Sequence, residues 1–230
     1  MTFLSFQNHK WPTASAGGSA SFVGDAIRAT FNTSHTFDSA TANTSGSGLP
    51  ATYPAMEALL GVFSTSAVPT SGTIDGASLG TPLISYTDGT LTLTVYKVTL
   101  AGGGSAQIVI NFGSSQPCAV ALYDITGMTV IDTLVFSDQS TTTSFPTNRN
   151  IASSDFLTTL AGDTVITFLR STSATIVWNQ QTQSCPATTN GSRRNSAGHI
   201  YAAAGGAPET MNVTMDAANR FTTCLSVQLR

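Results

Sequence analysis

The sequence has 230 residues and a formal net charge of −3, and only 9% of its residues are charged, where about 25% is usual. Its few basic residues are scattered, which argues against nucleic-acid binding because that requires a basic stripe facing many phosphates. No stretch approaches the ~20 apolar residues that span a bilayer. The opening MTFLSFQNHKWP lacks the basic and apolar regions of a secretory signal, so we expect folding in a cytoplasm without membrane contact.

The residue types favour strands over helices. There are 37 Thr and 27 Ser but only two Glu and two Lys. Straight charged side chains normally cover helix surfaces, whereas β-branched threonine suits the solvated face of a strand. We therefore expect an all-β protein, an antiparallel β-sandwich of jelly-roll or immunoglobulin-like type, with at most one or two short helices.

The first segment, residues 1–19, joins large apolar side chains to the small-residue run TASAGGSA. Apolar side chains on a terminal segment are costly unless they find a surface. The segment is therefore either an extended arm that docks on a neighbour or a first strand packed on its own sandwich. Residues 20–230 are expected to form a single sandwich domain. The candidate partner-binding residues of the arm are Phe3, Leu4, Phe6 and Trp11.

From Ser21 onward apolar and polar residues alternate, with turn residues at the spacing of a sandwich or barrel. The segments TLTLTVYKVTL and QIVINF flank three glycines, and we predict that they pair as a hairpin with the threonines on the solvated face. The predicted inward residues are Leu91, Leu93 and Val95 in the first segment and Ile108, Ile110 and Phe112 in the second.

Further strands are predicted in CAVALYDI, MTVIDTLVF, DTVITFLR, ATIVWNQQ, AGHIYAA, TMNVTMD and RFTTCLSVQL. The last places Leu225, Val227 and Leu229 on one face, and its regularity predicts a C-terminus held in a sheet. Two segments are ambiguous. We predict that PAMEALLGVFS is mostly strand and that SSDFLTTLA is a short helix begun by a serine cap.

No catalytic constellation is predicted. His9 lies in the arm, His35 in a predicted polar loop and His199 in a predicted strand, and no G-x-S-x-G motif occurs. Metal-ligand spacings and a phosphate-binding glycine loop are also lacking. We therefore predict no enzyme activity, no metal and no cofactor. Cys118 and Cys224 lie in predicted strands, where free cysteine behaves as a small buried hydrophobe.

Aromatic residues offer one binding possibility, because carbohydrate-binding sandwiches stack sugars on exposed rings. Core packing is the favoured interpretation for most of them, above all for Trp178. The candidates are Tyr86, Tyr96, Tyr123, Trp178 and Tyr201.

The order of segments also resembles that of a known class of proteins. ASFVG is followed by SGTIDGASLGTPLISYTDGTLTLTVYKVTLAGGGSAQIVINF, then CAVALYDITG, then ATIVW and SRRNSAGHIYAA. This pattern, over residues 20–229, resembles a loose class of virion structural proteins of tailed bacteriophages. The resemblance implies a β-sandwich carried on the virion as a head decoration or cement protein, a head fibre or a tail accessory protein.

The expected partners follow from this resemblance. They are the major capsid protein or other virion proteins, with the arm as the attachment segment and assembly in the host cytoplasm. Sheet edges and an apolar arm both favour a homo-oligomer, and a trimer would match the threefold positions of a capsid. The alternative function is a tail or head-fibre adhesin, a carbohydrate-binding module whose partner is a glycan.

Overall fold

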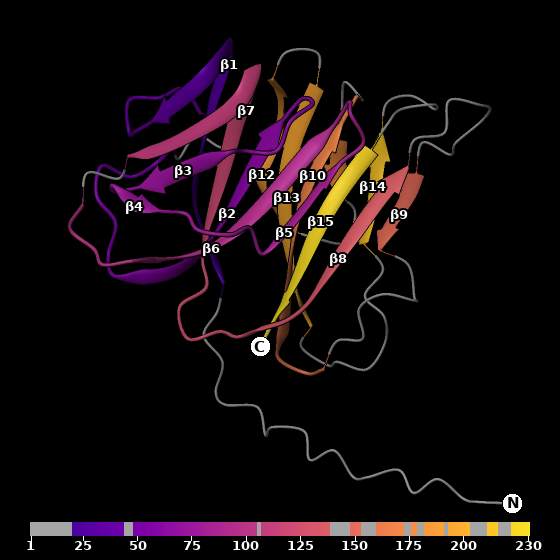
Figure 1. Cartoon of the computed structure of the whole chain (residues 1–230). Coiled ribbons are helices and arrows are strands. Elements are labelled where there is room, and N and C mark those ends of the chain that lie inside the picture. Colours follow the sequence, from indigo (N-terminus) through magenta and orange to yellow (C-terminus); the bar gives the residue numbers. More distant parts are fainter. Residues whose placement is uncertain are drawn as a thin grey trace, which may run out of the picture.

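The fold is all-β, as predicted, in the parts of the chain that the computed structural model describes (Figure 1). These parts contain no helix, and hence none that could cross a membrane. The four candidate arm residues and most of SSDFLTTLA lie outside them. The described residues are 20–43, 48–104, 107–138, 148–152, 160–172, 176–178, 182–190, 193–202, 211–215 and 222–230.

Three antiparallel sheets form the architecture. Sheet A has the order β4-β3-β7-β2-β6-β5. Strand β1 lies off this order and pairs with β7 along its length. The strands of sheet A are β1 (Ser21–Phe37), β2 (Met56–Ser64), β3 (Ser71–Ile74), β4 (Ala77–Ser78), β5 (Ile84–Thr87), β6 (Thr92–Leu100) and β7 (Ile108–Asp124).

Sheet B packs against sheet A in the manner of a sandwich, with the order β12-β13-β10-β15-β8, and the small sheet C has the order β11-β14-β9. Sheet B consists of β8 (Val130–Asp138), β10 (Asp163–Ser171), β12 (Thr182–Asn190), β13 (Arg193–Ala202) and β15 (Thr222–Leu229). Sheet C consists of β9 (Asn148–Ala152), β11 (Ile176–Trp178) and β14 (Met211–Met215).

Strand β2 lies at the centre of sheet A, and its pairing shows that the predicted hairpin is wrong. The segment PAMEALLGVFS does form a strand, but it pairs with β6 on one edge and with β7 on the other. The two segments around the three glycines are therefore separated by β2 and do not pair. The glycine loop instead crosses the entry to β2, where Gly103 N–H donates to Tyr53 O and a side chain at Gly102 would collide with Ala55.

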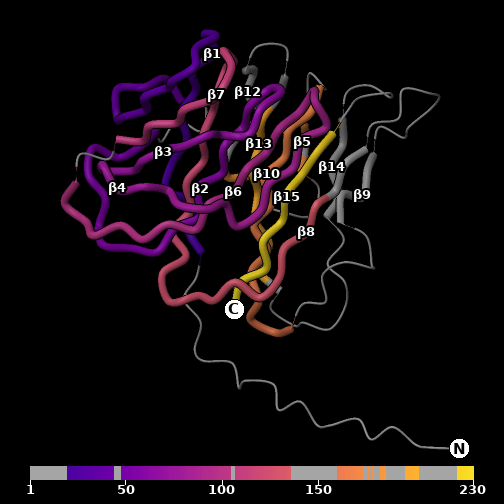
Figure 2. The backbone as a smooth tube through the Cα atoms, in the orientation of Figure 1, coloured from indigo at the N-terminus to yellow at the C-terminus, as the bar shows by residue number. Residues whose placement is uncertain are grey.

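Both faces of β2 are buried, and each contributes to a different hydrophobic core. Ala58, Leu60 and Val62 face a core enclosed by sheet A itself, which curls so that β1, β3 and β6 surround it. Leu59 and Phe63 face the second core, between sheets A and B. Figure 2 shows the curl of the chain around the first core and sheet B beside it.

The predicted inward residues of β6 and β7 are buried, but in different cores. Leu93 and Val95 lie between the sheets, whereas Ile108, Ile110 and Phe112 lie inside the curl. The threonine face of β6 was predicted to be solvated, and this is wrong. Thr92 and Thr94 are fully buried and hydrogen bonded to Thr87 and Ser85 of β5, because the curl leaves that face no solvent.

Contact between the two sheets centres on the ring of Phe168 from β10. The ring lies over Gly61 of β2, where an added Cβ would approach its Cδ1 to 2.3 Å. Tyr123 and Phe63 surround it edge-on, with centroids 5.7 Å and 6.2 Å away. Such edge-to-face pairs add to the free energy of burial.

The outer face of sheet B is also buried and largely polar. Cross-strand hydroxyls of β10 and β15 are hydrogen bonded, Thr167 with Ser226 at 2.9 Å and Ser171 with Thr222 at 3.1 Å. Trp178 of β11 covers part of this face and donates from Nε1 to Ser196 Oγ at 2.8 Å. The serines and threonines of these strands therefore satisfy one another inside the protein.

The C-terminal strand is held in the sheet, as predicted, with β10 on one edge and β8 on the other. Arg230 exchanges two backbone hydrogen bonds with Thr129 and places Nε 2.7 Å from Oδ1 of the fully buried Asp163. Burial raises the pKa of Asp163, but hydrogen bonds from Arg230, Leu160 and Gln228 outweigh it, so the pKa lies below its ordinary value.

Substitution Gly61→Ala tests the packing of Phe168. We expect it to destabilise the protein by about 1–3 kcal/mol, because the new methyl group overlaps the ring and overpacking forces the core apart. Urea unfolding measures the effect. Gly113→Ala is the control, since its Cβ would approach only Thr70, at 3.7 Å; equal stability of the two variants would contradict this account of the interface.

Candidate functional site

Strands β1 and β7 leave their regular ladder at a corner of sheet A. Arg28 pairs with Cys118, and the next pair is Asn32 with Gln116, so β1 has three residues where β7 has one. That one residue is Pro117, which has no N–H to donate to a ladder. Residues 28–34 are all exposed as a result.

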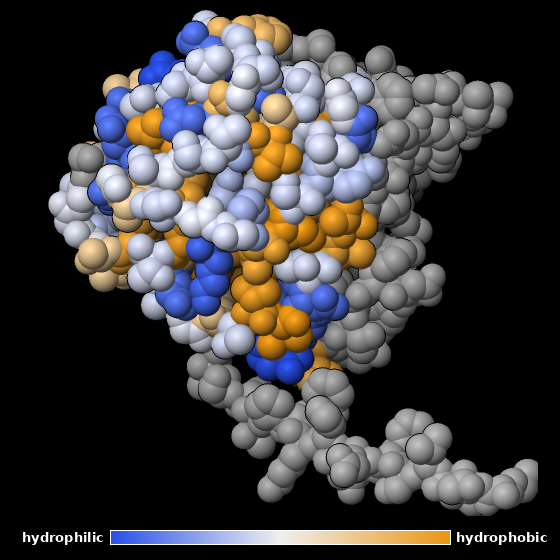
Figure 3. Space-filling view, in the orientation of Figure 1, coloured by the Kyte–Doolittle hydropathy of each residue, from blue (hydrophilic) through white to orange (hydrophobic). Residues whose placement is uncertain are grey.

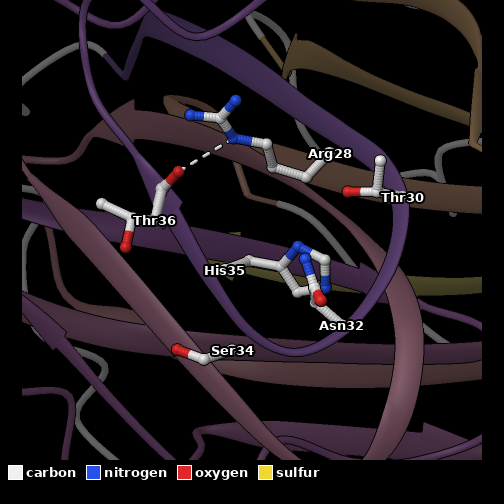
Figure 4. Close-up of a pocket in the computed structure, with 6 residues that line it drawn as sticks. All are labelled: Arg28, Thr30, Asn32, Ser34, His35 and Thr36. Carbon is white, nitrogen blue, oxygen red and sulfur yellow. Dashed lines mark hydrogen bonds between the residues drawn. The ribbon is translucent and has the colours of Figure 1, made fainter.

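A polar pocket of about 250 Å³ lies in the concave side of this corner (Figure 4). Its lining comes from alternate residues of β1, together with one histidine. The lining residues are Arg28, Thr30, Asn32, Ser34, His35 and Thr36.

Arg28 closes the corner and is fixed by it. Its Nε donates to Thr36 O at 3.0 Å, which ties the two limbs of β1 together as Figure 4 shows, and Nη2 donates to Thr41 Oγ1 at 3.0 Å. Thr41 is held in turn by Asp38 Oδ1 at 2.9 Å. Arg28 makes no ion pair with any described residue, so a positively charged group of fixed position lines the pocket.

His35 forms the buried part of the lining. It lies in strand β1 and not in the predicted polar loop. Its ring is 3% exposed and lies between Phe37 and Phe112, with centroids 6.2 Å and 6.1 Å away. Nε2 lies 2.6 Å from Gln116 O. A carbonyl oxygen only accepts, so Nε2 donates this hydrogen bond.

Gln116 stabilises this corner from behind. Its Oε1 accepts hydrogen bonds from the backbone N–H groups of Thr65, Ser66 and Ala67 at 3.1–3.2 Å. The carbonyl that orients His35 is therefore fixed to the end of β2. The pocket wall is set by the central strand of sheet A rather than by β1 alone.

A second polar pair joins β12 to β13. Ser184 Oγ lies 2.8 Å from His199 Nδ1, and the imidazole packs edge-on against Tyr123 at 6.4 Å. A serine nucleophile needs a histidine that is itself oriented by a third group. Among the described residues no carboxylate is hydrogen bonded to His199, and we interpret the pair as a cross-strand contact.

The aromatic candidates are mostly in the cores. Tyr96, Tyr123 and Trp178 are buried, as predicted for Trp178, and Tyr86 packs against the core between the sheets. Tyr201 is 62% exposed on β13. Sequence reasoning overlooked Phe31, which is 64% exposed at the β1 corner but does not line the pocket.

The cysteine predictions are confirmed where the structure describes the side chains. Cys118 and Cys224 are fully buried, and neither is part of a disulfide. Burial raises the pKa of the Cys118 thiol well above its ordinary value, against the opposing effect of the Arg170 charge. Both therefore act as small core residues.

An apolar surface occurs along β8, the edge strand of sheet B. Val135 pairs with Leu225 and so faces the same side as the core between the sheets, yet it is 37% exposed, and Ile131 is 43% exposed. Ile84 and Tyr86 of β5 are only partly buried against the same core. Figure 3 shows apolar side chains gathered over the region of β5, β15 and β8.

The predicted partner-binding residues of the arm stay a prediction. Phe3, Leu4, Phe6 and Trp11 lie outside the described residues. No group of three or more histidine, cysteine or acidic side chains placed to hold a metal occurs within the described parts of the chain.

Comparison with known protein families, with curated proteins and with solved structures finds no match to this chain. The resemblance to phage virion proteins therefore depends on the sequence pattern alone.

The signal for the corner pocket is present in the sequence but weak. Polar residues alternate through IRATFNTSHTF, and Pro117 directly precedes the segment CAVALYDI. Neither observation indicates that the two segments pair. The pocket depends on the pairing of β1 with β7.

The pH dependence of stability tests the environment of His199. Burial lowers its pKa below the ordinary 6.5, so the neutral form is favoured in the folded protein. Its contribution to stability is full above about pH 6.5 and is lost as the pH falls through the lowered pKa. His199→Gln should reduce the loss of stability measured by urea unfolding between pH 7.5 and about pH 5.

Ser184→Ala is the matched control for this measurement. It removes the hydrogen-bond partner of His199 but keeps the burial that shifts the pKa, so the pH dependence should persist. An unchanged pH profile in His199→Gln would show that this histidine is not the titrating group.

Proposed function

We propose that this chain is a structural protein of a tailed-phage virion, of the head decoration or cement type, that assembles as a homo-oligomer through its N-terminal arm. The sequence pattern over residues 20–229 supports the class, and the low charge and the Ser/Thr-rich composition suit a passive protein at high copy number. The observation that carries the assembly step is the exposed apolar surface along β8.

Strand β8 offers a surface that needs a partner. Within the described residues it pairs only with β15, and an unpaired strand edge beside exposed apolar side chains is a template for another chain. Val135 and Ile131 provide the apolar contacts, and Asp132 provides an exposed negative charge on the same strand.

The arm of a second copy fits this surface. Residues 3–11 are nine residues long, as is β8, and they contain the four candidate apolar residues. Lys10 supplies a charge opposite to that of Asp132. Pro12 follows directly and ends any ladder, because proline cannot donate a hydrogen bond to it. Each copy then donates one arm and receives another, a head-to-tail arrangement that can close into a ring.

The oligomeric state tests this assembly. Light scattering after size-exclusion chromatography should give an oligomer for the full chain and a monomer after deletion of residues 1–19 or with Ile131→Asp. Phe31→Asp, which places a charge on an exposed apolar residue outside β8, is the control and should stay oligomeric. A monomeric full chain, or an oligomeric deletion variant, would contradict the proposed exchange of arms.

Attachment to particles tests the virion function itself. Added to phage heads that lack this protein, the full chain should co-sediment with them, and the variant without residues 1–19 should not. Failure of the full chain to bind any head or tail preparation would overturn the structural function, whatever its oligomeric state.

A further inference from the structure

Three polar side chains of the β1 corner pocket are not used by the fold. The side chains of Thr30, Asn32 and Ser34 make no hydrogen bond with any described residue, although they line the same concavity. Polar groups that converge on a pocket and lack internal partners are the usual means by which a site fixes a ligand's orientation. The corner therefore presents free hydrogen-bonding capacity.

The charge of the lining favours an anionic ligand. Arg28 is the one cationic side chain of the lining, and no carboxylate lines the pocket with it. Its Nε and one N–H of Nη2 are engaged, which leaves Nη1 and the second N–H of Nη2 free. Adjacent guanidinium N–H groups match the two oxygens of a carboxylate. Since the internal hydrogen bonds already fix the side chain, little rotamer entropy is lost on binding.

The remaining lining groups point to hydroxyls on the ligand. Asn32 offers an amide oxygen that accepts and an NH2 group that donates, and Thr30 and Ser34 can both donate and accept. A phosphate or sulfate presents mostly acceptors and would use only the donors among these groups. A sugar ring presents O–H groups that both donate and accept. A volume of about 250 Å³ suits a single ring, since pockets for larger ligands are roughly 300–1,000 Å³.

We propose that the β1 corner pocket binds one acidic sugar residue, with its carboxylate on Arg28 and its hydroxyls on Asn32 and Ser34. The ligand class is a uronic or sialic acid unit of a surface polysaccharide. This site lies on β1 of sheet A and includes no residue of β8, so it adds glycan adhesion to an assembly function and does not depend on it. Phe31 lies outside the lining and takes no part in binding the sugar.

The site is tested by titrating the full chain with D-glucuronate and with N-acetylneuraminate. Isothermal calorimetry or ligand-observed NMR measures the binding. Saturable binding of at least one acidic sugar is expected, with glucose bound at least about tenfold more weakly, because it lacks the carboxylate and a tenfold change is about 1.4 kcal/mol. Absence of saturable binding by both acidic sugars would overturn the proposal.

Variants separate the pocket from the rest of the surface. Arg28→Gln should abolish the preference for acidic sugars. Because Arg28 also ties the corner together, Asn32→Ala and Ser34→Ala provide a second test, since neither side chain bonds to a described residue and each should weaken binding severalfold without loss of fold. Thr33→Ala, exposed on β1 outside the lining, is the control and should bind normally.

Inorganic phosphate distinguishes a glycan site from a simple anion site. The proposal expects phosphate to compete weakly. Phosphate binding as tight as that of the acidic sugars, unaffected by Asn32→Ala, would show a general anion site at Arg28 and would overturn the assignment to a sugar.

Discussion

The structure depends on burial of both faces of β2. Gly61, with no side chain, lets the ring of Phe168 lie against the backbone of this strand, and Leu59 and Phe63 extend the same contact along sheet B. On the opposite face Ala58, Leu60 and Val62 fill the curl of sheet A. One nine-residue strand therefore joins two cores, and interiors at this packing density tolerate extra volume poorly.

This burial changes the role of the abundant hydroxyl side chains. Thr92 and Thr94 of β6, and Thr167 and Ser226 of sheet B, lie inside the protein and bond to one another across strands. A buried hydroxyl without a partner is costly, whereas pairs of hydroxyls on neighbouring strands satisfy each other. The Ser/Thr-rich composition thus serves the interior as well as the surface.

The two proposed binding regions arise where the sheets stop being regular. The pocket exists because β1 and β7 bulge beside Pro117, which turns alternate polar residues into a concave lining. The apolar surface lies along β8, the edge strand of sheet B, where Val135 and Ile131 are exposed. Bulges and strand edges are common places for binding in β proteins, and here they lie on different sheets.

The sequence by itself determined the all-β class, most strands and the apolar faces of β6, β7 and β15, because alternation and turn residues are local signals. It identified β2 as a strand from GVFS, and it predicted burial of Trp178 and Cys118. Tertiary structure alone decided that β2 separates β6 from β7, that the threonine faces are buried, and that His35 and Arg28 share a pocket. These features depend on pairings between residues as far apart as His35 and Gln116, and strand alternation carries no information about which strands become neighbours.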